Sequence, residues 1–384
     1  MSREPPHYFG AGPALLPESV VKQASQDLIT YLSNDVGVCE ISHRSADAID
    51  IINTAKARLA QAYSIPDTHE ILFAQGGGTG AFAAVAYNLT AAYAKKTGKK
   101  GTANYLVTGS WSEKAAAEAK RLGFTTHIAA NSKQSAGKYG SIPDSATWQF
   151  TNDISYVYYC DNETVNGVEF PADISANLPQ GVDIVADMSS NILSREIDIS
   201  KFAAIVAGAQ KNIGVAGITV YIVRKDLLSR LPHEEEVALG LPIPPIVFDW
   251  PTLAKNNSTY NTLPIFGVHV LSLCVKSVLD KGGLKAQQEE SESKADKVYQ
   301  VIDKYPQVFN APVAKDARSI MNIVFTLPSP ELEKKFLDGA KELRLNGIKG
   351  HRSVGGIRIS NYNAVTPQSI DILVTYMESF AKII

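Results

Sequence analysis

Residues 202–212, Phe-Ala-Ala-Ile-Val-Ala-Gly-Ala-Gln-Lys-Asn, place a lysine just after an apolar segment. The run at 202–207 is short and is followed by Gly208, which is typical of a buried strand in a parallel sheet. Ligands of open α/β sheets gather at the carboxyl ends of the strands, where burial makes an amine more easily neutral and nucleophilic. Lys211 is therefore a candidate for bonding to an aldehyde. The alternative is a lysine that extends to solvent beside a loop.

A second apolar segment ends on an acid. Residues 181–187, Gly-Val-Asp-Ile-Val-Ala-Asp, read as another strand that terminates at Asp187. Pyridoxal phosphate requires a lysine that holds its aldehyde as an imine and a carboxylate that keeps its pyridine nitrogen protonated. Taken alone, Asp187 is more commonly a turn or helix-capping aspartate. Together, Lys211 and Asp187 predict a pyridoxal phosphate site.

A glycine-rich turn supplies a candidate phosphate site. Residues 71–75 read as a strand, residues 76–80 are Gly-Gly-Gly-Thr-Gly, and residues 81–89 have helical composition. A glycine turn into a helix N-terminus offers free N–H groups and the positive end of the helix dipole to a phosphate. The spacing matches neither the dinucleotide fingerprint nor the P-loop, so nucleotide binding is not supported. The alternative is a tight loop without a ligand.

Composition narrows the class of protein. The chain has 384 residues, 45% of them hydrophobic, and a net charge of −2, which suits one large or two medium domains without electrostatic attraction to nucleic acid or anionic membrane. No apolar run approaches the roughly 18 residues of a membrane span, and the polar start at 1–7 lacks the core of a signal peptide. Cys39, Cys160 and Cys274 are few and scattered, which argues against a disulfide or zinc framework. We expect a cytoplasmic protein without a metal site.

The order of segments predicts an α/β class. Apolar strand-like segments alternate with helical stretches, which indicates a mostly parallel sheet with helices on both faces. The strands are expected at 71–75, 104–108, 155–160, 182–186, 202–207 and 218–223, and the helices at 46–63, 80–95 and 112–121.

The pattern changes after the proline-rich residues 241–245, which cannot continue a helix or a central strand. Beyond them we expect a smaller α+β domain. Its elements are an apolar helix from Phe266, a charged helix over 285–304, strands near 320–326 and 357–360, and a helix from Pro367. The predicted division is a large domain at 1–264 and a C-terminal domain at 265–384.

Motifs in order along essentially the whole chain resemble phosphoserine aminotransferases, which are fold-type I pyridoxal phosphate enzymes of serine biosynthesis. The segments at 162–169, Asn-Glu-Thr-Val-Asn-Gly-Val-Glu, and at 350–356, Gly-His-Arg-Ser-Val-Gly-Gly, are specific to that family, whereas the lysine and aspartate fit any fold-type I enzyme. The other matching segments are His43-Arg44, Gln75-Gly76-Gly77-Gly78, Thr108-Gly109-Ser110-Trp111, Gln210-Lys211-Asn212 and Tyr260-Asn261-Thr262. The resemblance implies a homodimer that interconverts 3-phosphohydroxypyruvate and glutamate with phosphoserine and 2-oxoglutarate.

The resemblance also implies roles toward the cofactor. Trp111 would stack on the pyridine ring, Thr164 would bond the ring oxygen, and Gln210 would bond the phosphate. Asn261 and Thr262 would reach the cofactor phosphate of the neighbouring subunit.

The glycine turn and the N-terminus depart from the family. Thr79 stands where the family commonly has a larger polar side chain, often arginine, and Ala81 where glutamine is usual, so Gly78 and Thr79 are expected to contribute mainly backbone contacts. Residues 11–13 lack the serine that is common before Gly-Pro, and no contact is assigned to them.

Two His-Arg pairs and one arginine are the implied substrate-binding set. Arg358 would take the α-carboxylate. The pairs His43-Arg44 and His351-Arg352, from different subunits, would take the substrate phosphate or the side-chain carboxylate of glutamate, because arginine binds such groups through bidentate charged hydrogen bonds. Each residue taken singly is more often a surface ion-pair residue.

Three rival functions stay open. A cysteine desulfurase needs a mobile nucleophilic cysteine, for which Cys39 is the only candidate because Cys160 and Cys274 lie in apolar segments. An alanine- or serine-glyoxylate aminotransferase would not need two anion clamps. A ligand-binding protein without activity would have no need of Lys211 and Asp187.

Overall fold

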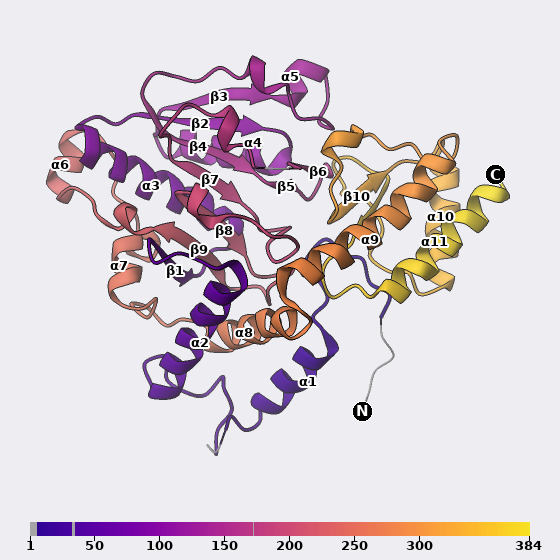
Figure 1. Ribbon diagram of the computed structural model, residues 1–384, viewed down its shortest axis with the longest axis horizontal. Coiled ribbons are helices and arrows are strands. Elements are labelled where there is room, and N and C mark those ends of the chain that lie inside the picture. Colours follow the sequence, from indigo (N-terminus) through magenta and orange to yellow (C-terminus); the bar gives the residue numbers. More distant parts are fainter. Residues whose placement is uncertain (1–5, 33–34, 172) are drawn as a thin grey trace.

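The computed structural model describes residues 6–32, 35–171 and 173–384, so most of the polar start considered above lies outside the described residues. A seven-stranded sheet forms its centre, in the order β1-β9-β8-β7-β4-β2-β3 (Figure 1). The strands are β1 His69–Ala74, β2 Thr102–Val107, β3 Thr126–Asn131, β4 Ile154–Cys160, β7 Ile184–Asp187, β8 Ala204–Gly208 and β9 Thr219–Arg224. All neighbours from β8 to β3 pair in parallel, whereas β9 runs antiparallel to both β8 and β1. The predicted α/β class with a mostly parallel sheet is confirmed.

Helices cover both faces of this sheet because the strands bury both sets of alternating side chains. On one face, Phe73, Tyr159 and Ile205 pack with α2 Ala46–Tyr63 and α8 Ile265–Asp280. On the other face, alternate strand residues such as Leu72, Tyr158 and Val206 pack with α3 Gly77–Thr97 and α4 Ser110–Arg121. Among the described residues, four shorter helices and several 3-10 turns complete this part; the helices are α1 Glu18–Asp27, α5 Ser132–Ala136, α6 His233–Ala238 and α7 Trp250–Lys255. No described helix is long and apolar enough to cross a membrane.

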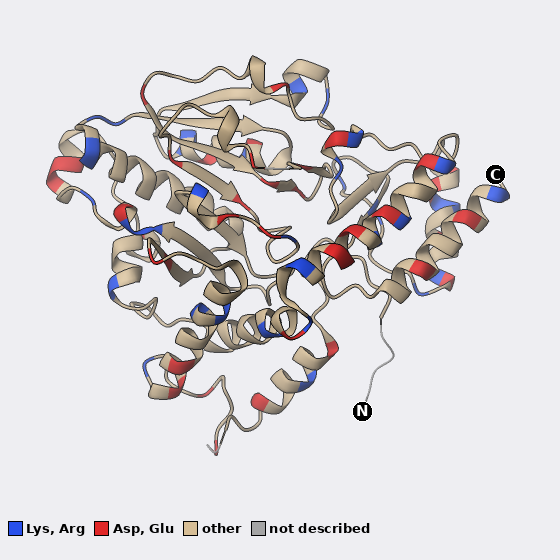
Figure 2. Ribbon diagram, in the orientation of Figure 1, with Lys and Arg blue, Asp and Glu red and all other residues tan. Residues whose placement is uncertain are grey.

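The C-terminal part has a separate core. The antiparallel strands β10 Asn322–Phe325 and β11 Ile357–Ser360 pack with α9 Gly283–Lys304, α10 Pro330–Glu342 and α11 Pro367–Lys382. Figure 2 shows acidic and basic residues along α9, which also buries Val298 and Ile302 in this core. The N-terminal Phe9 also belongs to it.

The position of α8 bears on the predicted domain boundary. Ile265, Val268 and Leu271 of α8 lie in the first core, against α2, although the predicted boundary assigns them to the C-terminal domain. We therefore propose that the division falls at the start of α9 rather than between residues 264 and 265.

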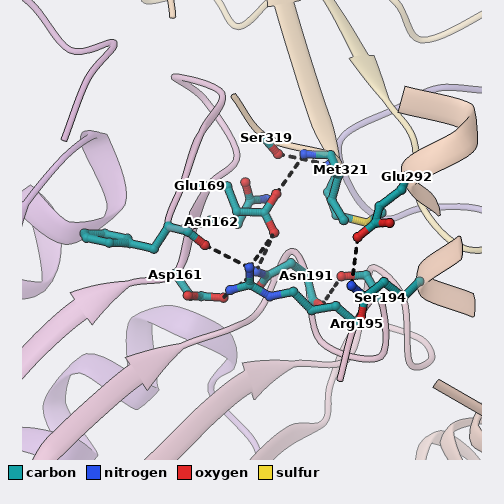
Figure 3. A network of polar contacts seen from close by, with 12 residues as sticks. Asp161, Asn162, Glu169, Asn191, Ser194, Arg195, Glu292, Ser319 and Met321 are labelled. Carbon is teal, nitrogen blue, oxygen red and sulfur yellow. Dashed lines mark hydrogen bonds and ion pairs between the residues drawn. The ribbon is translucent and has the colours of Figure 1, made fainter. Parts of the chain in front are cut away.

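A buried polar network joins the two parts (Figure 3). The guanidinium of Arg195 donates to Asp161 at 2.7 Å and lies 3.9 Å from Glu169. Asn191 donates to both carboxylates, at 2.5 and 3.0 Å. Glu169 in turn accepts a hydrogen bond at 2.8 Å from the backbone N–H of Ile320 in the C-terminal part. The network thus ties the loop after β7 to the second core.

Removing the cation of this network should destabilise the fold strongly. Arg195→Met leaves Asp161 and Glu169 buried without their partner, so we expect the free energy of unfolding to fall by about 3 to 5 kcal/mol. The matched control is Arg121→Met, which breaks an exposed pair with Glu118 and should cost less than about 1 kcal/mol. Urea unfolding of the three proteins measures both values, and equal losses would contradict this role of the network.

Candidate active site

A cavity of about 480 Å³ lies where the parallel strands end. It is lined from β7 by Asp187, from the loop after β8 by Lys211, and from the loop after β4 by Thr164. The in-register pairing of Cys160 with Asp187 and of Asp187 with Val206 brings these strand ends to one edge. Of the residues predicted from the sequence, the cavity is lined by Gly78, Thr79, Trp111, Thr164, Asp187, Gln210, Lys211, His351 and Arg358.

Lys211 is held with its amine buried. Lys211 is only 8% exposed, and its Nζ donates a hydrogen bond to Thr164 Oγ1 at 2.8 Å. Burial lowers the pKa of Lys211 to about 8, and the nearby carboxylate of Asp187 opposes part of this shift. Within the described part of the chain, Lys211 forms no ion pair. A substantial fraction of the amine is therefore neutral near pH 8, as a nucleophile or a proton acceptor must be.

Asp187 presents a carboxylate with two protein donors. The Tyr158 hydroxyl donates to Oδ2 at 3.1 Å, and the Ser189 N–H donates to Oδ1 at 2.9 Å. Burial and the charge of Asp187 raise the pKa of Tyr158 well above its usual value, so this hydroxyl stays protonated and remains a donor. Two donors leave acceptor capacity on the carboxylate, which lines the cavity and can take a further N–H.

The glycine turn opens α3 toward the cavity. Gly76 and Gly77 have φ of +110° and +58°, values that L side chains rarely adopt. Among the described residues, no side chain caps the N-terminus of α3, and a Cβ added at Gly77 or Gly78 would meet nothing within 4 Å. The turn therefore offers unpartnered N–H groups and open space, as a phosphate-binding loop requires. Ala81, in contrast, is a residue of α3 that is buried in the core and does not line the cavity.

The mouth of the cavity is cationic. Arg358 on β11 donates from Nη1 to the Thr164 carbonyl at 3.4 Å, and its Nε is buried without a partner among the described residues. Lys114 lies over the Trp111 ring, with Nζ 4.4 Å from the ring centroid. Burial and the charges of Arg358, Arg352 and Lys114 lower the pKa of His351. This concentration of positive charge favours an anionic ligand.

Five predicted site residues do not line this cavity, namely His43, Arg44, Asn261, Thr262 and Arg352. Arg352 is exposed next to His351, and Arg44 is exposed and donates to the Tyr260 carbonyl at 3.5 Å. Asn261 donates to Gln75 at 3.1 Å, and Gln75 donates to the Thr262 carbonyl at 2.9 Å. The segments 43–44 and 260–262 therefore form one surface beside the glycine turn, outside the chain's own cavity.

The sequence analysis missed several lining residues. It assigned no contact to residues 11–13, yet they line the cavity, and a Cβ at Gly12 would come within 3.3 Å of Lys211 Cγ. Gly12 has φ +125°, so this close cover of the lysine stem needs glycine. Asn162 and Ser190 also line the cavity and bond each other at 2.8 Å. The signal for Asn162 was its place in the family-specific motif.

The cysteines do not support nucleophilic chemistry. Cys160 lines the cavity, but burial raises the pKa of its thiol well above the usual value, and Sγ donates to the Asn162 carbonyl at 3.3 Å. Cys39 is exposed and is not part of the cavity lining. Among the described residues, no group of three or more His, Cys, Asp or Glu could hold a metal ion.

The lowered pKa of Lys211 predicts selective acylation of the protein freed of any cofactor. Because only the neutral amine reacts, labelling of Lys211 by acetic anhydride should rise with pH through a midpoint near 8. Lys294 is the control: its pKa is also lowered to about 8, but it is 2% exposed and donates to the Val365 carbonyl, so it should stay unlabelled. Peptide mapping measures both, and a Lys211 profile like that of the exposed Lys334 would contradict the assignment.

The donor set of the cavity fits pyridoxal phosphate. The open amides of α3 suit its phosphate, Asp187 has acceptor capacity for a protonated ring nitrogen, and Lys211 supplies an amine for its aldehyde. Trp111 lines the cavity, and its ring centroid lies 6.0 Å from Lys211 Nζ, so the indole is placed to pack on a ring bonded to that amine.

Comparisons with known proteins agree with this chemistry. The family model for aminotransferase class-V matches residues 7–373. The phosphoserine aminotransferase of Saccharomyces cerevisiae is 48% identical, over 100% of this chain and 99% of that protein. The solved structure of phosphoserine aminotransferase from Bacillus circulans subsp. alkalophilus has a TM-score of 0.89 at 39% identity and covers 98% of each chain. A structure of PLP-bound phosphoserine aminotransferase from Trichomonas vaginalis has a TM-score of 0.87 at 34% identity, covering 97% of this chain and 99% of that one.

The fold is thus the fold-type I architecture of pyridoxal phosphate aminotransferases, as the sequence predicted. The chain belongs to the phosphoserine aminotransferases, within the class-V aminotransferase family.

Proposed function

We propose that this site interconverts 3-phosphohydroxypyruvate and L-glutamate with O-phospho-L-serine and 2-oxoglutarate, in L-serine biosynthesis. The observation that carries the proposal is one cavity that holds a buried lysine amine, a strand-end carboxylate, an open helix N-terminus and a cationic mouth. The first three features suit the cofactor, and the fourth suits a substrate with two anionic groups.

Residues of this chain would hold the cofactor from several sides. Gly78 and Thr79 would bind its phosphate through backbone N–H groups, Gln210 would add a side-chain donor, Thr164 would bond the ring oxygen, and Trp111 would cover the ring. When bound, pyridoxal phosphate supplies a conjugated ring that accepts electrons from the substrate Cα. Asp187 would keep the ring nitrogen protonated by stabilising its positive charge.

Lys211 would move the proton. Its Nζ is partly neutral near pH 8 because burial disfavours the charged form, so it can accept a proton from the substrate Cα. The hydrogen bond to Thr164 Oγ1 fixes the position of the amine, and the cover by Gly12 limits the freedom of its stem.

The cationic mouth would select the substrate. Arg358 would bind the α-carboxylate, which every amino-acid substrate carries. Arg352 and His351, with His43 and Arg44 from the second subunit, would bind the phosphate or the glutamate side chain. A glyoxylate aminotransferase has no need of this second clamp. A binding protein without activity would not change the absorbance of its bound cofactor when glutamate is added.

The proposed active form is a homodimer with shared sites. The surface formed by segments 43–44 and 260–262 carries cationic and amide groups beside, but outside, the chain's own cavity. We propose that it completes the cavity of a second copy. The three free cysteines, two of them buried, support the proposed cytoplasmic location.

Substrate selectivity tests the function most directly. Loss of one charge-assisted clamp typically lowers kcat/KM by roughly tenfold to a few hundredfold. We expect Arg44→Ala and Arg352→Ala to lower the phosphoserine reaction by such a factor and to leave the poor serine reaction nearly unchanged. Arg358→Ala should weaken both. A coupled amino-transfer assay with the two substrates measures this, and equal losses for serine and phosphoserine in the first two variants would contradict the assignment.

Complementation tests the shared sites. The inactive variants Lys211→Ala and Asn261→Ala/Thr262→Ala are mixed under conditions of subunit exchange. Because half of the dimers become mixed and each mixed dimer has one intact site, recovery should reach about a quarter of wild-type activity. The control pairs Lys211→Ala with Asp187→Asn, whose defects lie in the same subunit's cavity, and should recover nothing. Absence of recovery in the first mixture would show that the sites are not shared.

A further inference from the structure

Glu163 is a buried carboxylate at the site to which the proposed mechanism gives no role. It is 0% exposed and ends β5 Asn162–Glu163, which pairs with β6 Val168–Glu169 in a short hairpin. The next residue, Thr164, bonds the amine of Lys211. Glu163 therefore lies one residue from a group that touches the reactive nitrogen.

The carboxylate of Glu163 holds the first turn of α4. Oε2 accepts from the Trp111 N–H at 2.8 Å, and Oε1 accepts from the Ser112 N–H at 2.8 Å and the Ser112 hydroxyl at 2.5 Å. These are the N–H groups that a helix N-terminus leaves without an intrahelical partner, and the helix dipole favours an anion there. Both oxygens are thus used, and both act as acceptors.

Gly109 shows how closely this carboxylate is seated. A Cβ at Gly109 would lie 2.4 Å from Glu163 Cδ and 2.6 Å from Oε2. The backbone of Gly109 is extended, with φ −172°, so any residue could adopt its conformation. The three atoms that an added Cβ would approach most closely all belong to Glu163, so an alanine there would push the carboxylate away from α4.

We propose that Glu163 is a positioning residue that sets Trp111 against the cofactor ring while its own chain neighbour, Thr164, sets the amine of Lys211. This inference rests on the proposed function. The side chain of Glu163 bonds the backbone of Trp111, whose ring centroid lies 6.0 Å from Lys211 Nζ, and its chain neighbour Thr164 bonds that same amine.

The electrostatics of Glu163 agree with this role. Burial raises the pKa of Glu163 to about 7, and the hydrogen bonds from Ser112 and Trp111 oppose the shift. Removing a carboxylate from water is strongly unfavourable unless hydrogen-bond donors replace the water. The three donors are all on α4, so the carboxyl group, whose ionised form they stabilise, is coupled to the position of that helix.

The first variant is Glu163→Gln, tested by equilibrium dialysis of the apoprotein with pyridoxal phosphate. The amide turns one acceptor into a donor, which opposes an N–H of α4, so cofactor affinity should fall by about tenfold or more. Gly109→Ala displaces the same carboxylate without changing its charge and should lower the affinity in the same direction. If Glu163→Gln does not fold, Gly109→Ala replaces it in every comparison.

The matched control is Glu169→Gln, the same chemical change on the other strand of the hairpin. Glu169 accepts from Asn191 and from the Ile320 N–H, whereas the bonds of Glu163 go to the first turn of α4, so cofactor affinity in Glu169→Gln should stay within about twofold of wild type even if stability falls. Thermal unfolding of each protein records the stability change.

A double-mutant cycle separates positioning from a general loss of structure. In a Trp111→Ala background, the ring that Glu163 sets is absent, so Glu163→Gln should change cofactor affinity by less than about threefold. An equal loss in both backgrounds, no loss in either, or the same loss in Glu169→Gln would overturn the proposal. Cofactor affinity does not depend on which substrate is used, so a protein inactive toward phosphoserine would refute the proposed function without deciding the role of Glu163.

Discussion

The burial of one amine without an ion pair is the constraint on which the rest of the site depends. Lys211 leaves β8 into a cavity where its only described hydrogen-bond partner is the hydroxyl of Thr164. Burial lowers its pKa to about 8, and the carboxylate of Asp187 limits the shift without pairing with it. A closer carboxylate would hold the amine protonated, whereas a more open site would restore its ordinary pKa. The distance between the two strand ends that carry Asp187 and Lys211 thus leaves the amine partly neutral near pH 8, as proton transfer needs.

The hairpin at 162–169 relates this amine to the remainder of the molecule. One glutamate, Glu163, accepts from the first turn of α4 in the large part. The other, Glu169, belongs to the network of Figure 3 and accepts from the Ile320 N–H of the C-terminal part. At the tip, a Cβ on Gly167 would come within 2.7 Å of Val324, so the hairpin packs directly on β10. The hairpin therefore contacts both α4, which carries Trp111, and the C-terminal part, which carries Arg358.

Much of this architecture could be predicted from the sequence because the buried strands are nearly continuous apolar runs and the charged helices keep a 3.6-residue period. Lys211 and Asp187 could be paired because parallel strands end at one edge. β3 was missed since this edge strand is half exposed and has little apolar pattern, and α10 was missed although Ser329 and Pro330 are a helix-start signal. No local pattern in the sequence encodes the packing of α8 on α2 or the hydrogen bond from the Trp111 N–H to Glu163, because each joins positions far apart in the chain.

The central claim is that Lys211, at the end of β8, is the residue that bonds the cofactor. Peptide mapping of the holoenzyme after borohydride reduction tests it most directly, because reduction makes the bond between the amine and the cofactor permanent. The account predicts the cofactor label on the peptide that contains Lys211. Lys201 precedes β8 and Lys225 follows β9, and both are exposed. A label on either of them would contradict the account.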